Sequence, residues 1–183
     1  MAVWKLAPAI AAGNCVVLKP AEQTPVSILY VMELIADLIP AGVINIVNGF
    51  GVEAGKPLAS SRRIAKIAFT GSTSTGRVIA QAAANNLIPA TLELGGKNAL
   101  IVLEDADMDM AVCGAAWASY LHQGQICMSA GRHLVHQRIV EDYTQRMVAK
   151  AKALPVGNPF TEPVAMGPMI TAKQVERVQR LVD

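Results

Sequence analysis

One stretch of the chain decides the fold class. Residues 64–94 read IAKIAFTGSTSTGRVIAQAAANNLIPATLEL, with short apolar runs at both ends and an alanine-rich segment between them. The pattern predicts a strand over Ile64–Phe69, a helix over Arg77–Asn85 and a second strand over Ala90–Leu94. Because a helix joins the two strands, we expect them to run parallel with a right-handed crossover. This arrangement is the repeating unit of an open α/β fold.

The same alternation extends toward the N-terminus. Two further apolar runs, Cys15–Lys19 and Val43–Val47, are predicted to be buried strands. Between them, Thr24 is expected to cap a helix that has Pro25 at its first position and ends at Pro40–Gly42. The first half of the chain therefore predicts an open, parallel, Rossmann-like sheet with helices between its strands.

The pattern changes after Gly95-Gly96, and we place a domain boundary there. Residues 1–94 form the first predicted domain, and residues 95–183 form the start of a second α/β domain. The second domain is expected to contain a strand, a helix capped by an Asp-Ala-Asp turn, another strand, an amphipathic helix and a Pro/Gly-rich connection. These elements correspond to Asn98–Leu103, a helix from Asp105–Asp107 to Tyr120, His133–Val135, Ile139–Leu154 and Pro155–Pro168.

Composition excludes several classes of protein. The 183 residues are 52% hydrophobic and 16% charged, which excludes an intrinsically disordered chain. No apolar run reaches the roughly 18–20 residues of a membrane span, and the basic residues are scattered, so neither a membrane nor a nucleic-acid partner is expected. Three cysteines and no secretory signal predict a cytoplasmic protein without a disulfide framework. No metal is expected, because His122, His133 and His136 have no further ligands at metal-binding spacing.

Two residues could carry covalent chemistry. Cys127 lies in the glycine-flanked segment Gly124–Gly131, where backbone N–H groups can stabilise a thiolate. It could equally be a small apolar side chain in a loop. Glu93 lies inside an apolar strand before two glycines, so partial desolvation would suit a general base working near neutral pH. The alternative is a glutamate that faces outward in the ordinary alternation of a strand.

A second group of residues could hold a nucleotide. Gly71, Ser72 and Gly76 lie in a turn between a strand and a helix, where backbone amides can bind phosphate, although any glycine-rich turn of this kind looks similar. Lys19 and Glu22 follow the first strand, at the edge of the sheet where α/β folds bind ligands, but they could also be two ordinary surface charges. A lysine there can contact ribose or phosphate oxygens. A glutamate would repel a 2′-phosphate, which favours NAD over NADP.

Six segments, in order along the chain, resemble the aldehyde dehydrogenase superfamily. They cover residues 4–14, 17–25, 40–45, 69–76, 92–97 and 124–127 and read WKLAPAIAAGN, VLKPAEQTP, PAGVIN, FTGSTSTG, LELGGK and GQIC. The resemblance implies that Cys127 is the nucleophile and Glu93 the general base. The cofactor contacts that it implies are Lys19 and Glu22 for the adenosine ribose, Gly71, Ser72 and Gly76 for the pyrophosphate, Gly51 and Gly55 on the adenine side, and Leu94 near the nicotinamide.

The reaction implied by this resemblance is the oxidation of an aldehyde to a carboxylic acid with NAD. An aldehyde would bind covalently to Cys127 as a thiohemiacetal and then a thioester, which water activated by Glu93 would hydrolyse. Residues 121–133 and 154–159 look most like the aromatic-aldehyde branch, which includes benzaldehyde, vanillin and salicylaldehyde dehydrogenases. The full-length form is expected to be a homo-oligomer.

Several family segments are not in the chain, which leaves alternatives open. They are a Trp-Asn-Phe-Pro-type segment with the oxyanion-hole asparagine, a Glu-x-Phe-Gly-Pro segment and the oligomerisation strands. Residues 1–94 are therefore expected to be a partial NAD-binding domain and residues 95–183 a partial catalytic domain. One alternative is an inactive fragment or a nucleotide-binding remnant. Another is a CoA-acylating semialdehyde dehydrogenase, which would have less need of the base Glu93.

Overall fold

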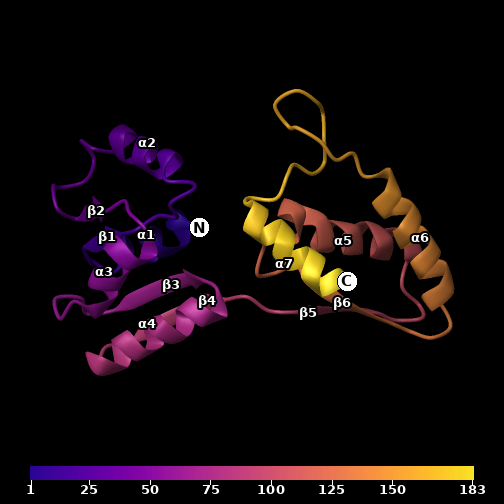
Figure 1. Cartoon of the computed structure of the whole chain (residues 1–183), viewed down its shortest axis with the longest axis horizontal. Coiled ribbons are helices and arrows are strands. Elements are labelled where there is room, and N and C mark those ends of the chain that lie inside the picture. Colours follow the sequence, from indigo (N-terminus) through magenta and orange to yellow (C-terminus); the bar gives the residue numbers. More distant parts are fainter. The chain divides into compact units, whose positions relative to one another are not determined.

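The computed structural model describes all 183 residues and contains two compact units, Met1–Leu94 and Gly95–Asp183 (Figure 1). In each unit short strands pair in parallel and a helix connects the paired strands. The α/β class with parallel strands, predicted from the sequence, is confirmed.

The first unit contains two separate parallel ladders. Its elements in chain order are α1 (Ala2–Ala11), β1 (Val16–Leu18), α2 (Val26–Leu34), β2 (Ile44–Ile46), the π-helical turn η1 (Gly51–Gly55), α3 (Lys56–Ser60), β3 (Ile67–Gly71), α4 (Thr73–Asn85) and β4 (Ala90–Leu94). β1 pairs with β2 through Val16 and Ile44, and β3 pairs with β4 through Ile67 and Ala90. The carboxyl ends of β1 and β2 therefore lie at one edge of the first ladder.

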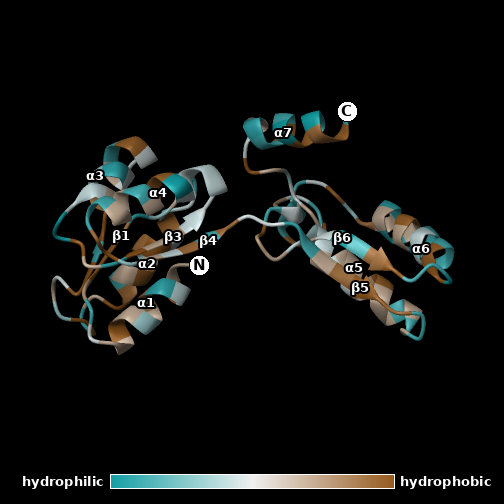
Figure 2. Cartoon of the chain, turned by 90° about the horizontal axis from the view of Figure 1, so that it is seen from below, coloured by the Kyte–Doolittle hydropathy of each residue, from teal (hydrophilic) through white to brown (hydrophobic).

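The second unit contains one parallel ladder, and its hydrophobic core lies where one strand of this ladder packs against two helices. Its elements are β5 (Asn98–Val102), α5 (Met108–Tyr120), the 3₁₀ turn η2 (Leu121–Gly124), β6 (Ala130–Val135), α6 (Val140–Ala153) and α7 (Ala172–Val182). Val102, Val112, Ala115 and Tyr143 form the buried cluster that joins β5, α5 and α6. Figure 2 shows β5 as mainly hydrophobic and α7 as mainly hydrophilic.

Three helices differ from the sequence-based expectation. α4 begins at Thr73 instead of Arg77, because the Ser72 hydroxyl accepts a hydrogen bond from the Thr75 N–H at 3.2 Å and caps the helix earlier. The prediction that Thr24 caps α2 is wrong: its N–H donates to the Ala21 carbonyl in a turn. α2 then begins at Val26 and ends at Leu34, well before Pro40–Gly42. α7 was not expected at all.

Few side chains are fully buried in either unit. Leu6, Ala59 and Ala83 are the buried apolar residues of the first unit, whereas Trp4 on α1 is 70% exposed. None of the helices has both the length and the apolar character that crossing a bilayer requires.

Candidate functional site

Lys19 lies just beyond the end of β1 and holds two chain segments together. Its ammonium group donates to the Pro20 carbonyl at 2.6 Å and to the Gly49 carbonyl at 3.1 Å, and it lies 3.5 Å from Glu22 Oε2. Only 18% of the Lys19 side chain is exposed, and these acceptors fix the position of its ammonium group. The residue thereby connects the end of β1 to the loop after β2.

Glu22 forms the outer half of this pair. A hydrogen bond from its own backbone N–H lowers the pKa of Glu22, and the neighbouring Lys19 ammonium lowers it as well, while burial acts in the opposite direction. The carboxylate is therefore ionised at neutral pH and remains partly exposed. It can accept hydrogen bonds from hydroxyl groups and would repel an additional phosphate.

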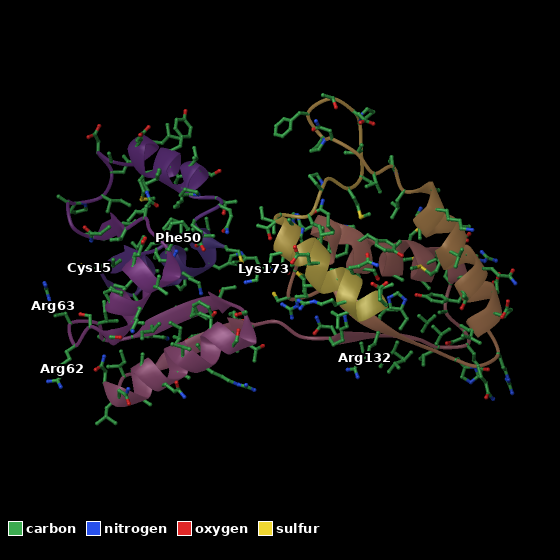
Figure 3. The ribbon with its side chains drawn as sticks, viewed as in Figure 1. Cys15, Phe50, Arg62, Arg63, Arg132 and Lys173 are labelled. Atoms are coloured by element: carbon green, nitrogen blue, oxygen red, sulfur yellow. The ribbon has the colours of Figure 1, made fainter.

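A hollow of about 490 Å³ lies after β2, at the segment that Lys19 contacts. Its lining residues come from the end of β2, the η1 turn and α3; they are Val47, Asn48, Gly49, Glu53, Ala54, Pro57, Leu58 and Ser61. The η1 turn starts after Phe50, which is labelled in Figure 3. The Phe50 N–H donates to Glu53 Oε2 at 3.4 Å. Gly49 lines the hollow and its carbonyl accepts from Lys19, so the hollow borders the loop that the Lys19 ammonium group holds.

The predicted adenine-side glycines do not themselves line this hollow. Gly51 and Gly55 lie in the η1 turn, and a Cβ at Gly55 would lie 3.6 Å from Lys19 Cδ. Gly49 lines the hollow instead, and the sequence analysis missed it. The signal was the Asn48-Gly49 dipeptide, which is typical of a turn; the φ of Gly49 is +147°.

The turn after β3 places the three predicted phosphate-binding residues in different roles. The Ser72 hydroxyl caps α4 and donates to Thr75 Oγ1 at 2.9 Å, so it already has partners within its own turn. Gly76 is buried, and a Cβ there would lie 2.6 Å from Leu94 Cδ2. A Cβ at Gly71 would meet the ring of Phe69. Gly76 and Leu94 thus form a close contact between α4 and β4.

Glu93 lies on β4 and its side chain is exposed. The expectation that Glu93 is partly desolvated is wrong. Side chains alternate between the two faces of a strand, and Leu92 and Leu94 lie on the half-buried face of β4, so Glu93 lies on the exposed face. Its carboxylate acts on Lys5 of α1: burial lowers the pKa of Lys5, and the negative charge of Glu93 acts to raise it. The effect of Glu93 on Lys5 is smaller than that of burial, and the pKa of Lys5 is lowered overall.

Cys127 lies in the second unit, in an exposed turn between η2 and β6. The Cys127 carbonyl accepts a hydrogen bond from Asn98 Nδ2 at 2.7 Å, so this contact is made by the backbone of the residue and not by its sulfur. The preceding residues His122, Gln123 and Gly124 all have positive φ values, of 52°, 59° and 70°. Backbone in this sparsely populated region is concentrated at functional sites.

The turn is also held by a segment that is distant in sequence. The Gln125 side chain accepts a hydrogen bond from the Ile170 N–H at 3.2 Å. The Ser129 hydroxyl donates to the Gly124 carbonyl at 3.3 Å, which closes the turn around Cys127. The candidate nucleophile therefore lies in the second unit, on a turn with several anchors, whereas the candidate base and nucleotide contacts lie in the first unit.

Comparison with known proteins identifies the family. The family model described as "Aldehyde dehydrogenase family" matches residues 1–183. The chain belongs to the aldehyde dehydrogenase family. Acetaldehyde dehydrogenase 2 from Cupriavidus necator is 51% identical to it over 100% of this chain and 37% of that protein. The chain thus spans a little over a third of the length of this curated relative.

Solved structures of the family have the same fold. A protein of Burkholderia cenocepacia described as an aldehyde dehydrogenase is 49% identical and superposes with a TM-score of 0.96, covering 100% of this chain and 37% of that one. Betaine aldehyde dehydrogenase from Staphylococcus aureus, solved in complex with NAD+, is 37% identical with a TM-score of 0.95, over 100% of this chain and 36% of that one. The resemblance inferred from six sequence segments is therefore confirmed at the level of the family.

Proposed function

We propose that this chain carries the nucleophile, the general base and part of the NAD site of an enzyme that oxidises an aldehyde to a carboxylic acid. The observation that carries the proposal is the exposed thiol of Cys127 on an anchored turn, in a chain that matches the aldehyde dehydrogenase family throughout. Residues 1–94 are then part of the NAD-binding domain, and residues 95–183 part of the catalytic domain.

Lys19 and Glu22 fit the adenosine ribose of the cofactor. The carboxylate of Glu22 can accept from ribose hydroxyls, while the oriented ammonium of Lys19 can donate to ribose or phosphate oxygens. The negative charge of Glu22 favours NAD over NADP, because it would repel a 2′-phosphate. The NAD+ complex of the Staphylococcus aureus relative supports a nicotinamide dinucleotide as the cofactor. When bound, the cofactor supplies the acceptor for a hydride.

The remaining cofactor contacts are proposed from the same resemblance. Ser72 lies at the N-terminus of α4, where unpaired backbone N–H groups favour an anion such as a pyrophosphate. Gly71 and Gly76 would serve this turn by allowing its close packing. Gly51 and Gly55 would shape the η1 turn beside the adenine, and Leu94 would lie near the nicotinamide.

The chemistry of the chain's own residues follows in two stages. The Cys127 thiolate attacks the carbonyl carbon, forming a C–S bond and a thiohemiacetal alkoxide. Loss of hydride from that carbon restores the C=O bond and leaves a thioester on Cys127. Glu93 then takes a proton from water as the water oxygen attacks the thioester. The C–S bond breaks, the carboxylic acid leaves, and the thiolate returns.

The finer proposal is that the substrate is an aromatic aldehyde, on the basis of segments 121–133 and 154–159. The Cupriavidus necator relative is named for acetaldehyde, so benzaldehyde and acetaldehyde are the two substrates to compare. A preference for acetaldehyde would contradict the aromatic proposal and leave the general one intact.

Acylation of Cys127 tests the nucleophile without needing hydride transfer. Incubation of the chain with p-nitrophenyl acetate should place an acetyl thioester on Cys127, detected by mass spectrometry of peptides. Cys15 and Cys113 are also exposed and serve as internal controls. Glu93→Gln should slow the loss of the acetyl group at neutral pH. Equal labelling of all three cysteines would contradict the proposed nucleophile.

A second candidate function is nucleotide binding without turnover. It is favoured because the proposed adenosine contacts lie within the unit Met1–Leu94, while Cys127 lies in the other. Calorimetric titration with NAD should detect binding that weakens in Lys19→Ala and not in Lys56→Ala. Binding of NAD without preferential acetylation of Cys127 would favour this second function, whereas the absence of aldehyde oxidation by the 183-residue chain alone is expected under both functions.

A further inference from the structure

Asn98, the first residue of β5, contacts two carbonyl groups of the Cys127 turn. Its side-chain amide nitrogen donates to the Cys127 carbonyl at 2.7 Å and to the Ser129 carbonyl at 3.2 Å. The NH₂ group has two hydrogens, so one side chain can satisfy both acceptors at once. Because Asn98 and Cys127 are far apart in sequence, this pair of bonds ties the turn to a different strand.

The backbone around this contact is irregular in a way that supports it. Asn98 pairs with Ala130, but Ala99 pairs with Arg132, so Gly131 is an extra residue in β6. Such a bulge bends a strand and redirects the residues beside it. A Cβ at Gly131 would meet the Cδ and Cε atoms of Lys97, so that side chain would have to move to admit it.

A second contact closes the same junction. Arg132 Nε donates to the Lys97 carbonyl at 3.2 Å, immediately after the bulge (Figure 3). The start of β6 is therefore held to the start of β5 on both sides of Gly131. The Cys127 turn leads directly into this junction.

We propose that Asn98 is a positioning residue for the Cys127 thiol, acting through the carbonyls of Cys127 and Ser129. This inference rests on the proposed role of Cys127 as the nucleophile. The amide holds the Cys127 and Ser129 carbonyls against β5, and the side chain of Cys127 projects from a backbone of defined orientation. Asn98 needs no contact with the substrate, because it acts through the main chain of the nucleophile.

Two substitutions separate the amide donor from the shape of the side chain. Asn98→Ala removes both hydrogen bonds, whereas Asn98→Asp keeps the shape and replaces the donor by a carboxylate that faces two carbonyl oxygens. Asn45→Ala is the matched control: Asn45 on β2 in the other unit also donates to two carbonyls, of Gly42 at 2.8 Å and Val16 at 3.4 Å. Asn98→Asp also serves where Asn98→Ala fails to fold.

Hydrogen exchange of the Ser129 amide measures whether the turn is held. Its N–H donates to the Ile126 carbonyl at 3.1 Å, which makes it a reporter of the turn. Asn98→Ala and Asn98→Asp should speed its exchange about tenfold, the change expected from one or two lost hydrogen bonds. Asn45→Ala should leave it unchanged. Unchanged exchange in both Asn98 variants, or an equal effect of Asn45→Ala, would overturn the inference.

Alkylation by iodoacetamide measures the effect on the thiol itself. In Asn98→Asp the carboxylate lies beside Cys127 and disfavours the thiolate, so alkylation of Cys127 should slow about threefold at neutral pH and its pH profile should move upward. The profile of Cys113 in the same molecule should not move. Acetylation of Cys127 by p-nitrophenyl acetate should slow at least threefold in Asn98→Ala. An unmoved profile together with unchanged acetylation would overturn the positioning role.

The outcomes also distinguish this inference from the proposed function. If the unmodified chain shows no preferential acetylation of Cys127, the nucleophile proposal fails, while exchange of the Ser129 amide still decides whether Asn98 anchors the turn. If Cys127 is acetylated preferentially and the Asn98 variants behave like the parent chain, the function stands and the role of Asn98 is wrong.

Discussion

Replacing Gly76 with alanine is expected to destabilise the unit Met1–Leu94, although alanine is the better helix former. A Cβ at this position would lie 2.6 Å from Leu94 Cδ2 and 2.9 Å from Leu94 Cδ1. Gly76 is buried at the contact between α4 and β4, so the added methyl group cannot turn toward solvent. Either the Leu94 side chain or the helix must move.

Two opposing contributions set the size of the effect. Alanine gains about 0.5–1 kcal/mol over glycine in a helix. Inserting a methyl group into a packed contact costs about 1–3 kcal/mol. We therefore expect Gly76→Ala to lower the free energy of unfolding, by up to about 2.5 kcal/mol. Gly114 in α5 is the matched control: no atom lies within 4 Å of its Cβ position, so Gly114→Ala should raise stability by about 0.5–1 kcal/mol.

Urea unfolding followed by circular dichroism measures both changes, and a double-mutant cycle locates the cause. Leu94→Ala removes the atoms that the new methyl group would meet. In that background Gly76→Ala should cost nothing or become stabilising, which gives a coupling free energy of about 1 kcal/mol or more. The reasoning is refuted if Gly76→Ala stabilises the parent chain as much as Gly114→Ala does, or if Leu94→Ala leaves its cost unchanged.

Three further predictions address the cap, the charged pair and the core. Ser72→Ala should cost about 1 kcal/mol of unfolding free energy, whereas Thr24→Ala, which removes no helix cap, should change it little; equal losses in thermal melts would contradict the assigned caps. Glu22→Gln should cost at most about 0.5 kcal/mol at pH 7. The lowered pKa of Glu22 makes its contribution present above about pH 4.3 and lost as the pH falls through the folded-state pKa, so the unfolding midpoints of parent and variant should converge in acid. Tyr143→Phe should cost about 1–2 kcal/mol, because the buried Tyr143 hydroxyl lies 2.8 Å from His133 Nδ1; a neutral result in urea unfolding would argue against that bond.

Local patterns predicted the elements of this chain well where a single signal was strong. β4 was expected and found at Ala90–Leu94, and α5 begins after Asp107, whose carboxylate accepts from the Met110 N–H at 2.9 Å. Boundaries failed where two signals competed. Ser72 could serve as a turn residue or as a cap, and the structure uses it as the cap of α4.

The predicted site residues divide in a similar way. Lys19 and Glu22 are three positions apart, and the structure brings them together as a pair. The environment of Glu93 was not predicted correctly, because its exposure depends on which side of β4 the rest of the unit covers. Gly49 was missed as a lining residue, since the parallel pairing of β1 with β2, together with the contact from Lys19, brings its loop to the end of β1.

By itself, the sequence determined the α/β alternation, the family and the candidate nucleophile, because periodicity and motifs are properties of neighbouring residues. Only the tertiary structure decided that Lys19 meets Gly49 and that Asn98 meets Cys127. The physical reason is parallel pairing: each connecting helix returns the chain to the same end of a ladder, so residues about thirty positions apart become neighbours. A local sequence pattern does not predict contacts between residues so far apart in the chain, and the anchoring of the Cys127 turn by Asn98 is such a contact.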